Sequence, residues 1–107
     1  MTDAPTTAIV VFETQPDDAD ELVRLARATQ PIFARQPGFL GGTMHLSEDR
    51  RRLIEILRWR SREDNDACFM SPDWQAPEGQ AFMAFVGSGK ATMEPQVYSS
   101  EEYAPAG

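Results

Sequence analysis

The segment Thr7-Ala-Ile-Val-Val-Phe-Glu13 decides the fold class of this chain of 107 residues. It is rich in β-branched residues, and apolar side chains fill both of its alternating sets, Ile9 and Val11 in one and Val10 and Phe12 in the other. Successive side chains of a strand point to opposite faces. The segment therefore predicts a strand that is covered from both sides.

A second segment, from Arg52 to Trp59, has the same two-sided character. Alternation places Leu53, Glu55, Leu57 and Trp59 on one face and Ile54, Ile56 and Arg58 on the other. Polar residues 47–50 form a turn before it, so we expect a hairpin with a preceding strand that ends near Ser47. A two-layer domain would leave one sheet face open to water, which predicts that a partner subunit covers it.

Helical patterns occupy the stretch between the first two predicted strands. Carboxylates gather over residues 17–21, where they favour the positive end of a helix dipole. Apolar residues then recur at helical spacing from Ala19 to Phe33. Pro31 lacks a backbone donor, so we expect a kink or a break before Phe33.

Two further helices and a last strand follow the hairpin. Ser61 with Asp64 three residues later is a variant of the capping box, which predicts a helix that stops before Ser71. Another helix is expected from about 77 to 86, and a strand from about 92 to 99. The order β-α-β-β-α-(α)-β predicts an α+β fold, the ferredoxin-like split βαβ arrangement with an antiparallel sheet. We expect a single domain over residues 1–107, with a core of about 7–99 and a polar C-terminal tail.

Composition restricts the partners and the compartment. The formal net charge of −7 disfavours nucleic acid and an anionic membrane as partners, because both repel an acidic surface. No window approaches the ~20 apolar residues of a membrane helix. A single cysteine, Cys68, makes no internal disulfide, so the sequence indicates a cytoplasmic protein.

Familiar cofactor and metal motifs are not completed in this sequence. Gly87-Ser88-Gly89-Lys90 resembles a phosphate loop, but Ala84 and Ala91 stand where that motif needs a glycine and a Ser or Thr. One histidine and one cysteine cannot assemble a zinc site of nitrogen and sulfur ligands within one chain. We therefore expect no cofactor and no metal.

Three short stretches are distinctive when taken together: Gln36-Pro37-Gly38-Phe39 after the first helix, Arg58-Trp59-Arg60-Ser61 at the exit of the hairpin, and Ser71-Pro72-Asp73-Trp74 beyond the next helix. With these stretches the chain resembles the antibiotic biosynthesis monooxygenase family. The resemblance covers roughly residues 7–99. It implies a dimeric α+β barrel, in which the four-stranded sheets of two subunits pack face to face, and hence a homodimer.

The same resemblance implies a cofactor-independent monooxygenase that acts on an aromatic, quinol-like or polyketide-like small molecule together with O2. Haem-degrading members use an Asn in the first strand and a His in the helix before the last strand, and this sequence has neither. Two alternatives stay open: a non-catalytic dimeric module for small-molecule binding or stress response, and a polyketide cyclase on the same barrel.

Three residues are candidates for the chemistry. Asn65 and Trp59 best match the Asn and Trp that related aromatic-polyketide oxygenases place near the second helix, although Trp59 is equally well explained as a core aromatic residue. His45 is the obvious general base, since histidine is the residue type that exchanges a proton most readily near neutral pH, but it also suits a solvent-facing position. Trp74, Phe69 and Phe82 are expected to bind the substrate from the helical side, with core packing as the alternative.

Overall fold

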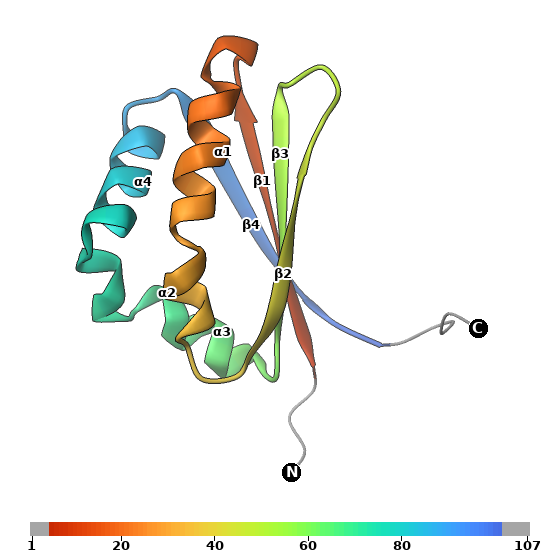
Figure 1. The fold of residues 1–107 in the computed structure, drawn as a ribbon. Coiled ribbons are helices and arrows are strands. Elements are labelled where there is room, and N and C mark those ends of the chain that lie inside the picture. Colours follow the sequence, from red (N-terminus) through yellow and green to blue (C-terminus); the bar gives the residue numbers. More distant parts are fainter. Residues whose placement is uncertain (1–4, 102–107) are drawn as a thin grey trace.

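Four strands form one antiparallel sheet in the computed structural model, which describes residues 5–101 (Figure 1). The spatial order is β2-β3-β1-β4, so the first strand lies between the third and the fourth. Together with the helices between the strands, this order is the ferredoxin-like split βαβ arrangement, and the predicted α+β fold is confirmed. The strands are β1 (Thr6–Thr14), β2 (Phe39–Leu46), β3 (Arg52–Trp59) and β4 (Ala91–Ser99).

All the helices lie on one face of the sheet (Figure 1). They are α1 (Ala19–Ala28), α2 (Gln30–Ala34), α3 (Arg62–Phe69) and α4 (Pro77–Gly87), with short 3-10 turns η1 (Pro16–Asp18) and η2 (Pro72–Gln75). The predicted break before Phe33 is confirmed, because Thr29 separates α1 from α2 two residues before Pro31. The Thr29 hydroxyl donates to the carbonyl oxygen of Ala26 at 2.7 Å, which satisfies a polar group at this junction.

Two local features fix the ends of the hairpin. Ser61 caps α3 as the sequence predicted, because its hydroxyl oxygen accepts the backbone N–H of Asp64 at 3.2 Å. Gly38 turns the chain into β2 with a φ of +79°, a conformation that favours glycine. A Cβ atom at Gly38 would also overlap the Asp64 carboxylate, so this turn packs tightly against the start of α3.

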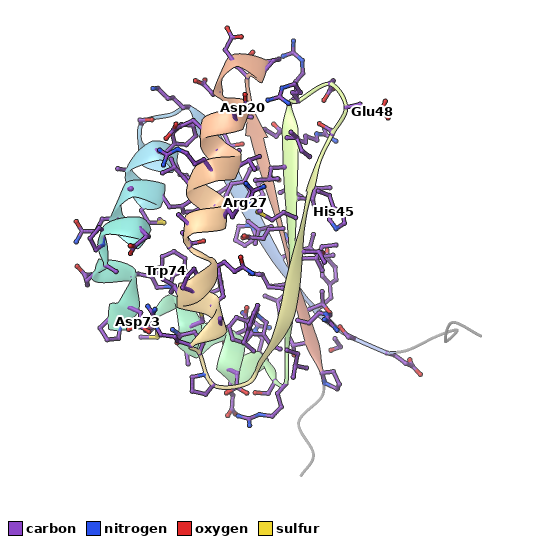
Figure 2. The ribbon with its side chains drawn as sticks, viewed as in Figure 1. Asp20, Arg27, His45, Glu48, Asp73 and Trp74 are labelled. Atoms are coloured by element: carbon purple, nitrogen blue, oxygen red, sulfur yellow. The ribbon has the colours of Figure 1, made fainter. Side chains whose placement is uncertain are left out.

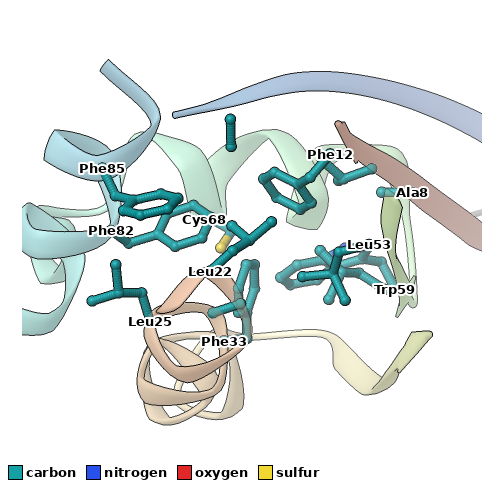
Figure 3. Packing of buried hydrophobic residues seen from close by; sticks show 14 residues of the cluster. Ala8, Phe12, Leu22, Leu25, Phe33, Leu53, Trp59, Cys68, Phe82 and Phe85 are labelled. Carbon is teal, nitrogen blue, oxygen red and sulfur yellow. The ribbon is translucent and has the colours of Figure 1, made fainter. Parts of the chain in front are cut away.

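The core lies between the sheet and the helices (Figure 3). Strand alternation is observed as predicted: Leu53, Glu55, Leu57 and Trp59 of β3 face the helices and are buried. The opposite face of the sheet carries further apolar side chains that are only partly buried, among them Ile9, Val11, Ile54 and Ile56. No element within residues 5–101 covers that face in one subunit (Figure 1).

Candidate functional site

A largely aromatic cavity of about 270 Å³ lies between the inner face of the sheet and the helices. Its volume approaches the ~300–1,000 Å³ usual for small-molecule sites. Strands β1, β3 and β4 supply one wall, and α2, α3, η2 and α4 supply the other. The lining residues are Val10, Phe12, Thr29, Phe33, Glu55, Phe69, Trp74, Phe82, Met83 and Met93.

The aromatic residues of this cavity hold one another in place. Trp74 is stacked on Phe69, with ring centroids 6.3 Å apart, and meets Phe33 edge to face at 5.4 Å. Phe12 and Phe82 form another edge-to-face pair at 5.6 Å. Such ring pairs favour fixed relative orientations, so the cavity presents ring faces and edges that suit a flat aromatic ligand.

Trp74 is oriented by a hydrogen bond as well as by its ring contacts. Its indole N–H donates to the backbone carbonyl of Cys68 at 3.0 Å, which ties η2 to the C-terminal end of α3. Because the indole N–H is already engaged, Trp74 offers a ligand its apolar ring. The Cys68 thiol is buried, and burial raises its pKa to about 11, so it is neutral near pH 7.

A smaller cavity of about 150 Å³ adjoins the first. It lies between these helices and strands β2 and β3, and Arg27 and Gln30 supply polar groups there. Two residues, Phe33 and Glu55, line both cavities. Their side chains therefore form the boundary between the aromatic cavity and a more polar compartment.

Glu55 is the one ionisable residue among the described residues that line the larger cavity. It is 8% exposed, and within residues 5–101 its carboxylate makes no ion pair and no side-chain hydrogen bond. Burial disfavours the charged form and raises the pKa of Glu55 to about 7. A carboxyl group with this pKa exchanges a proton readily near neutral pH.

The structure brings together the three residues predicted to bind the substrate. Trp74, Phe69 and Phe82 all line the larger cavity, although they come from η2, α3 and α4. Phe69 is 49% exposed and Met83 is 46% exposed, whereas Phe82 is buried. Phe69 and Met83 therefore stand at the mouth of the cavity and Phe82 lies deeper; their contact with a substrate stays a prediction.

Trp59 and Asn65 are buried in the core and line neither cavity. Trp59 lies beside Phe33 and Phe39, with ring centroids 6.5 and 5.0 Å away. Among the described residues, the buried side-chain atoms without a hydrogen-bond partner are the Trp59 indole nitrogen and the Asn65 amide oxygen. An unsatisfied donor and an unsatisfied acceptor are unusual in a core, and the predicted roles of both residues remain predictions.

His45 lies on the face of the sheet that points away from the helices (Figure 2). It is exposed, and its imidazole Nε2 is 3.0 Å from the Thr43 hydroxyl. The sheet thus separates His45 from both cavities of the same subunit. Its predicted role as a general base stays a prediction, and the structure does not group it with Asn65 or Trp59.

Sequence reasoning assigned Glu55 to a strand face but not to the site. The available signal was a carboxylate between Leu53 and Leu57, at the alternating positions of a buried face. Carboxylates are rarely fully buried without a partner, so a glutamate in that position is a candidate for function. Within the described residues, no cluster of three His, Cys, Asp or Glu side chains forms a metal site.

A ferredoxin-like α+β domain with an aromatic cavity between its sheet and helices is the class of protein that these features define. The chain belongs to the antibiotic biosynthesis monooxygenase family, whose model matches residues 5–77. None of the helices in residues 5–101 is long and apolar enough to cross a membrane.

A sequence relative agrees with this assignment, and solved structures share the fold. The tetracenomycin-F1 monooxygenase of Streptomyces glaucescens is 33% identical over 70 residues, which cover 64% of this chain and 62% of that relative. The fold matches SnoaB, a cofactor-independent oxygenase from Streptomyces nogalater, with a TM-score of 0.71 and 22% identity over 96% of this chain and 99% of SnoaB. Rv0793 from Mycobacterium tuberculosis matches with a TM-score of 0.74 and 24% identity over 95% and 100% of the two chains.

Proposed function

We propose that this protein is a cofactor-independent monooxygenase of an aromatic, quinol-like or polyketide-like small molecule. The observation that carries the proposal is the aromatic cavity of about 270 Å³ with one buried carboxylate in its wall. Membership of the monooxygenase family and the relative that acts as tetracenomycin-F1 monooxygenase support it. We further propose that the protein acts in the cytoplasm, as its single cysteine suggests.

The chemistry asks little of the protein beyond a suitable environment. Once deprotonated, an anthrone or hydroquinone is electron-rich and passes electrons to O2 itself. For an anthrone, one CH2 group and one O2 become one carbonyl group and one water. The protein supplies a water-excluding cavity and a proton acceptor. A donor for the developing oxyanion is also needed, and Trp59 and Asn65 remain the predicted candidates, although neither lines the cavity. The Trp59 indole N–H is unpaired, whereas the Asn65 amide N–H donates to the Asp66 carboxylate at 3.2 Å.

Blocking the mouth of the cavity tests this assignment. Met83 lines the cavity and is 46% exposed, so Met83→Trp should narrow the entrance without disturbing the core. We expect the KM for dithranol, measured by oxygen uptake of metal-free protein, to rise at least ~10-fold, because part of the ligand area is then excluded. Met70→Trp is the matched control, since Met70 is 85% exposed and does not line the cavity.

The same assay separates the alternatives. Oxygen uptake at the buffer rate by the wild-type protein would contradict the proposal. Tight binding of dithranol without uptake would then favour a non-catalytic binding module, and product formation under nitrogen would favour a cyclase. Loss of uptake in a Trp59→Phe/Asn65→Ala double variant that keeps its fold would support the predicted roles of these two residues.

We also propose that two copies of the chain associate through the uncovered face of the sheet. Ile9 and Val11 of β1 and Ile54 and Ile56 of β3 form an apolar strip there, and none of them is fully buried in one subunit. Adjacent apolar side chains on an open face are typical of an interface. A second copy presents the same strip, so a symmetric pair would bury both strips at once.

A further inference from the structure

We propose that Glu55 is the catalytic base of this site, and that it removes the proton from an acidic C–H or O–H of the arene bound in the aromatic cavity. This inference rests on the proposed oxygenase function for its substrate. It goes beyond that function by assigning the proton transfer to a strand residue in the cavity wall. The geometry of the two cavities and the surroundings of the carboxylate carry the argument.

The position of Glu55 suits a proton acceptor. It is held at the centre of the sheet, where Val10 of β1 and Met44 of β2 are its paired neighbours on either side. It lines the aromatic cavity and also the smaller cavity that Arg27 and Gln30 border. A proton taken from a ligand in the first cavity can therefore leave through the second, more polar one without crossing the aromatic wall.

The groups around Glu55 leave its carboxylate free to act. The charged or titratable groups that face it are Arg27 from α1, which is exposed, and the Cys68 thiol from α3. The cavity residues from α2, η2, α4 and β4 are Phe33, Trp74, Phe82, Met83 and Met93, all uncharged. No ion pair of the described residues stabilises the carboxylate, and its pKa of about 7, raised by burial, matches a base that works near neutral pH.

The transfer balances as a simple proton exchange. The carboxylate of Glu55 takes the proton, the C–H or O–H bond breaks, and its electron pair stays on the arene as an enolate or phenolate. The negative charge thus moves from a compact carboxylate to a delocalised ring system, which an apolar cavity tolerates better. The arene anion then reduces O2, as in the proposed reaction, and neutral Glu55 releases its proton to solvent before the next turnover.

Anaerobic spectroscopy tests the proton transfer separately from the oxygen chemistry. Dithranol is mixed with the protein under nitrogen near pH 7, and the long-wavelength absorption of its conjugate base is recorded. We expect the band with the wild-type protein and its loss in Glu55→Gln, which keeps the shape of the side chain but cannot accept the proton. In air, Glu55→Gln should lower kcat/KM for oxygen uptake by ~10²–10⁴-fold.

Two variants guard against a purely structural effect. Glu48→Gln makes the same chemical change at an exposed turn residue and should keep the band (Figure 2). Glu55→Asp keeps a carboxylate but withdraws it by one methylene, so it should retain a weaker band and a rate that still rises with pH. If Glu55→Gln does not fold, the aspartate variant decides: a rate equal to that of the wild type, with an unchanged pH profile, overturns the proposal.

The outcomes distinguish the two proposals. A band under nitrogen without oxygen uptake in air would support Glu55 as a base and contradict the monooxygenase function. Oxygen uptake without a Glu55-dependent band would overturn the role of Glu55 and leave the monooxygenase function standing. Absence of the band in the wild-type protein, or its loss in His45→Ala together with its retention in Glu55→Gln, would also overturn the assignment.

Discussion

Glu55 shows how one residue combines a cost in stability with a use in chemistry. Its carboxyl group sits between Leu53 and Leu57 on the buried face of β3, where an apolar side chain would pack without any loss of hydration. The pKa is raised to about 7 because burial penalises the charged form, and no described partner offsets that penalty. Phe33 and Trp74 line the same cavity as Glu55, and these apolar surroundings disfavour the charged form of its carboxyl group.

The raised pKa predicts how stability depends on pH. Glu55 has the ordinary glutamate pKa of 4.5 in the unfolded chain and a pKa of about 7 in the folded one, so the native state holds an extra proton between these pH values. The contribution of the Glu55 carboxyl group to the free energy of unfolding is therefore fully present below about pH 4.5 and is lost as the pH rises through 7. Between pH 4.5 and 8 the wild type should lose roughly 3 kcal/mol of its free energy of unfolding through this group. Glu55→Gln lacks the carboxyl group and should not show this loss.

Urea unfolding of both proteins across this pH range measures the difference. Glu48→Gln serves as the control, because its side chain is exposed and should follow the wild-type curve. A wild-type-minus-Gln difference that stays constant from pH 4.5 to 8 would show that the carboxyl group titrates normally, in conflict with its burial.

The contact between η2 and α4 positions the helical wall of the cavity. Gly79 in the first turn of α4 is buried, and a Cβ atom there would lie 2.5 Å from the carbonyl oxygen of Trp74. The backbone of η2 therefore approaches α4 as closely as glycine allows. This approach sets the depth at which the Trp74 ring enters the cavity, between Phe33 and Phe69.

Gly79→Ala should disturb both stability and the site. The added methyl group meets backbone rather than a flexible side chain, so we expect a loss of ~1–3 kcal/mol and a drop in Tm of ~4–8 °C per kcal/mol. Displacement of Trp74 should also weaken dithranol binding, which is measured by the quenching of tryptophan fluorescence. Gly87→Ala in the same helix is the control, because nothing lies within 4 Å of its Cβ position, and it should be neutral or stabilising. Equal Tm values for the two variants would contradict the close approach.

At the scale of the molecule, the sheet is covered on one face only. The helices bury the inner face, while Ile9, Val11, Ile54 and Ile56 remain partly accessible on the other (Figure 1). A chain of 107 residues exposes a large fraction of its surface, so an open apolar sheet face is costly unless it is shared. A second copy packed against this face would turn two open sheets into one closed core.

The dimer proposal predicts the mass of the particle in solution. Light scattering after gel filtration should give twice the 12.0 kDa of one chain. Ile54→Glu should reduce the mass to that of a monomer, because it places a charge at the centre of the shared face. Ala84→Glu, on the exposed surface of α4, should remain dimeric. A wild-type mass of 12.0 kDa at micromolar concentration would contradict the proposal.

The helices, the strands and their order could be predicted from local patterns in the chain. Alternation in Arg52–Trp59 placed each side chain on its face, Ser61 marked the start of α3, and Pro31 marked the break after α1, because strand period, capping and a missing donor are local properties. Trp74, Phe69 and Phe82 were expected from the sequence to bind a substrate, with core packing as the alternative. All three line the cavity, and their contact with a substrate stays a prediction.

The position of the buried charge in the site depends on contacts between distant parts of the chain. Periodicity put Glu55 on the inner face, but its surroundings come from distant parts of the chain: Thr29, Phe33, Trp74, Phe82 and Met93 line the same cavity. In the same way, His45 lies on the face of the sheet that the helices do not cover, away from the cavities. Trp59 lies on the inner face, beside the ring of Phe33. Burial, and with it the pKa of a carboxyl group, is set by neighbours in space, and the local pattern of a strand does not contain them.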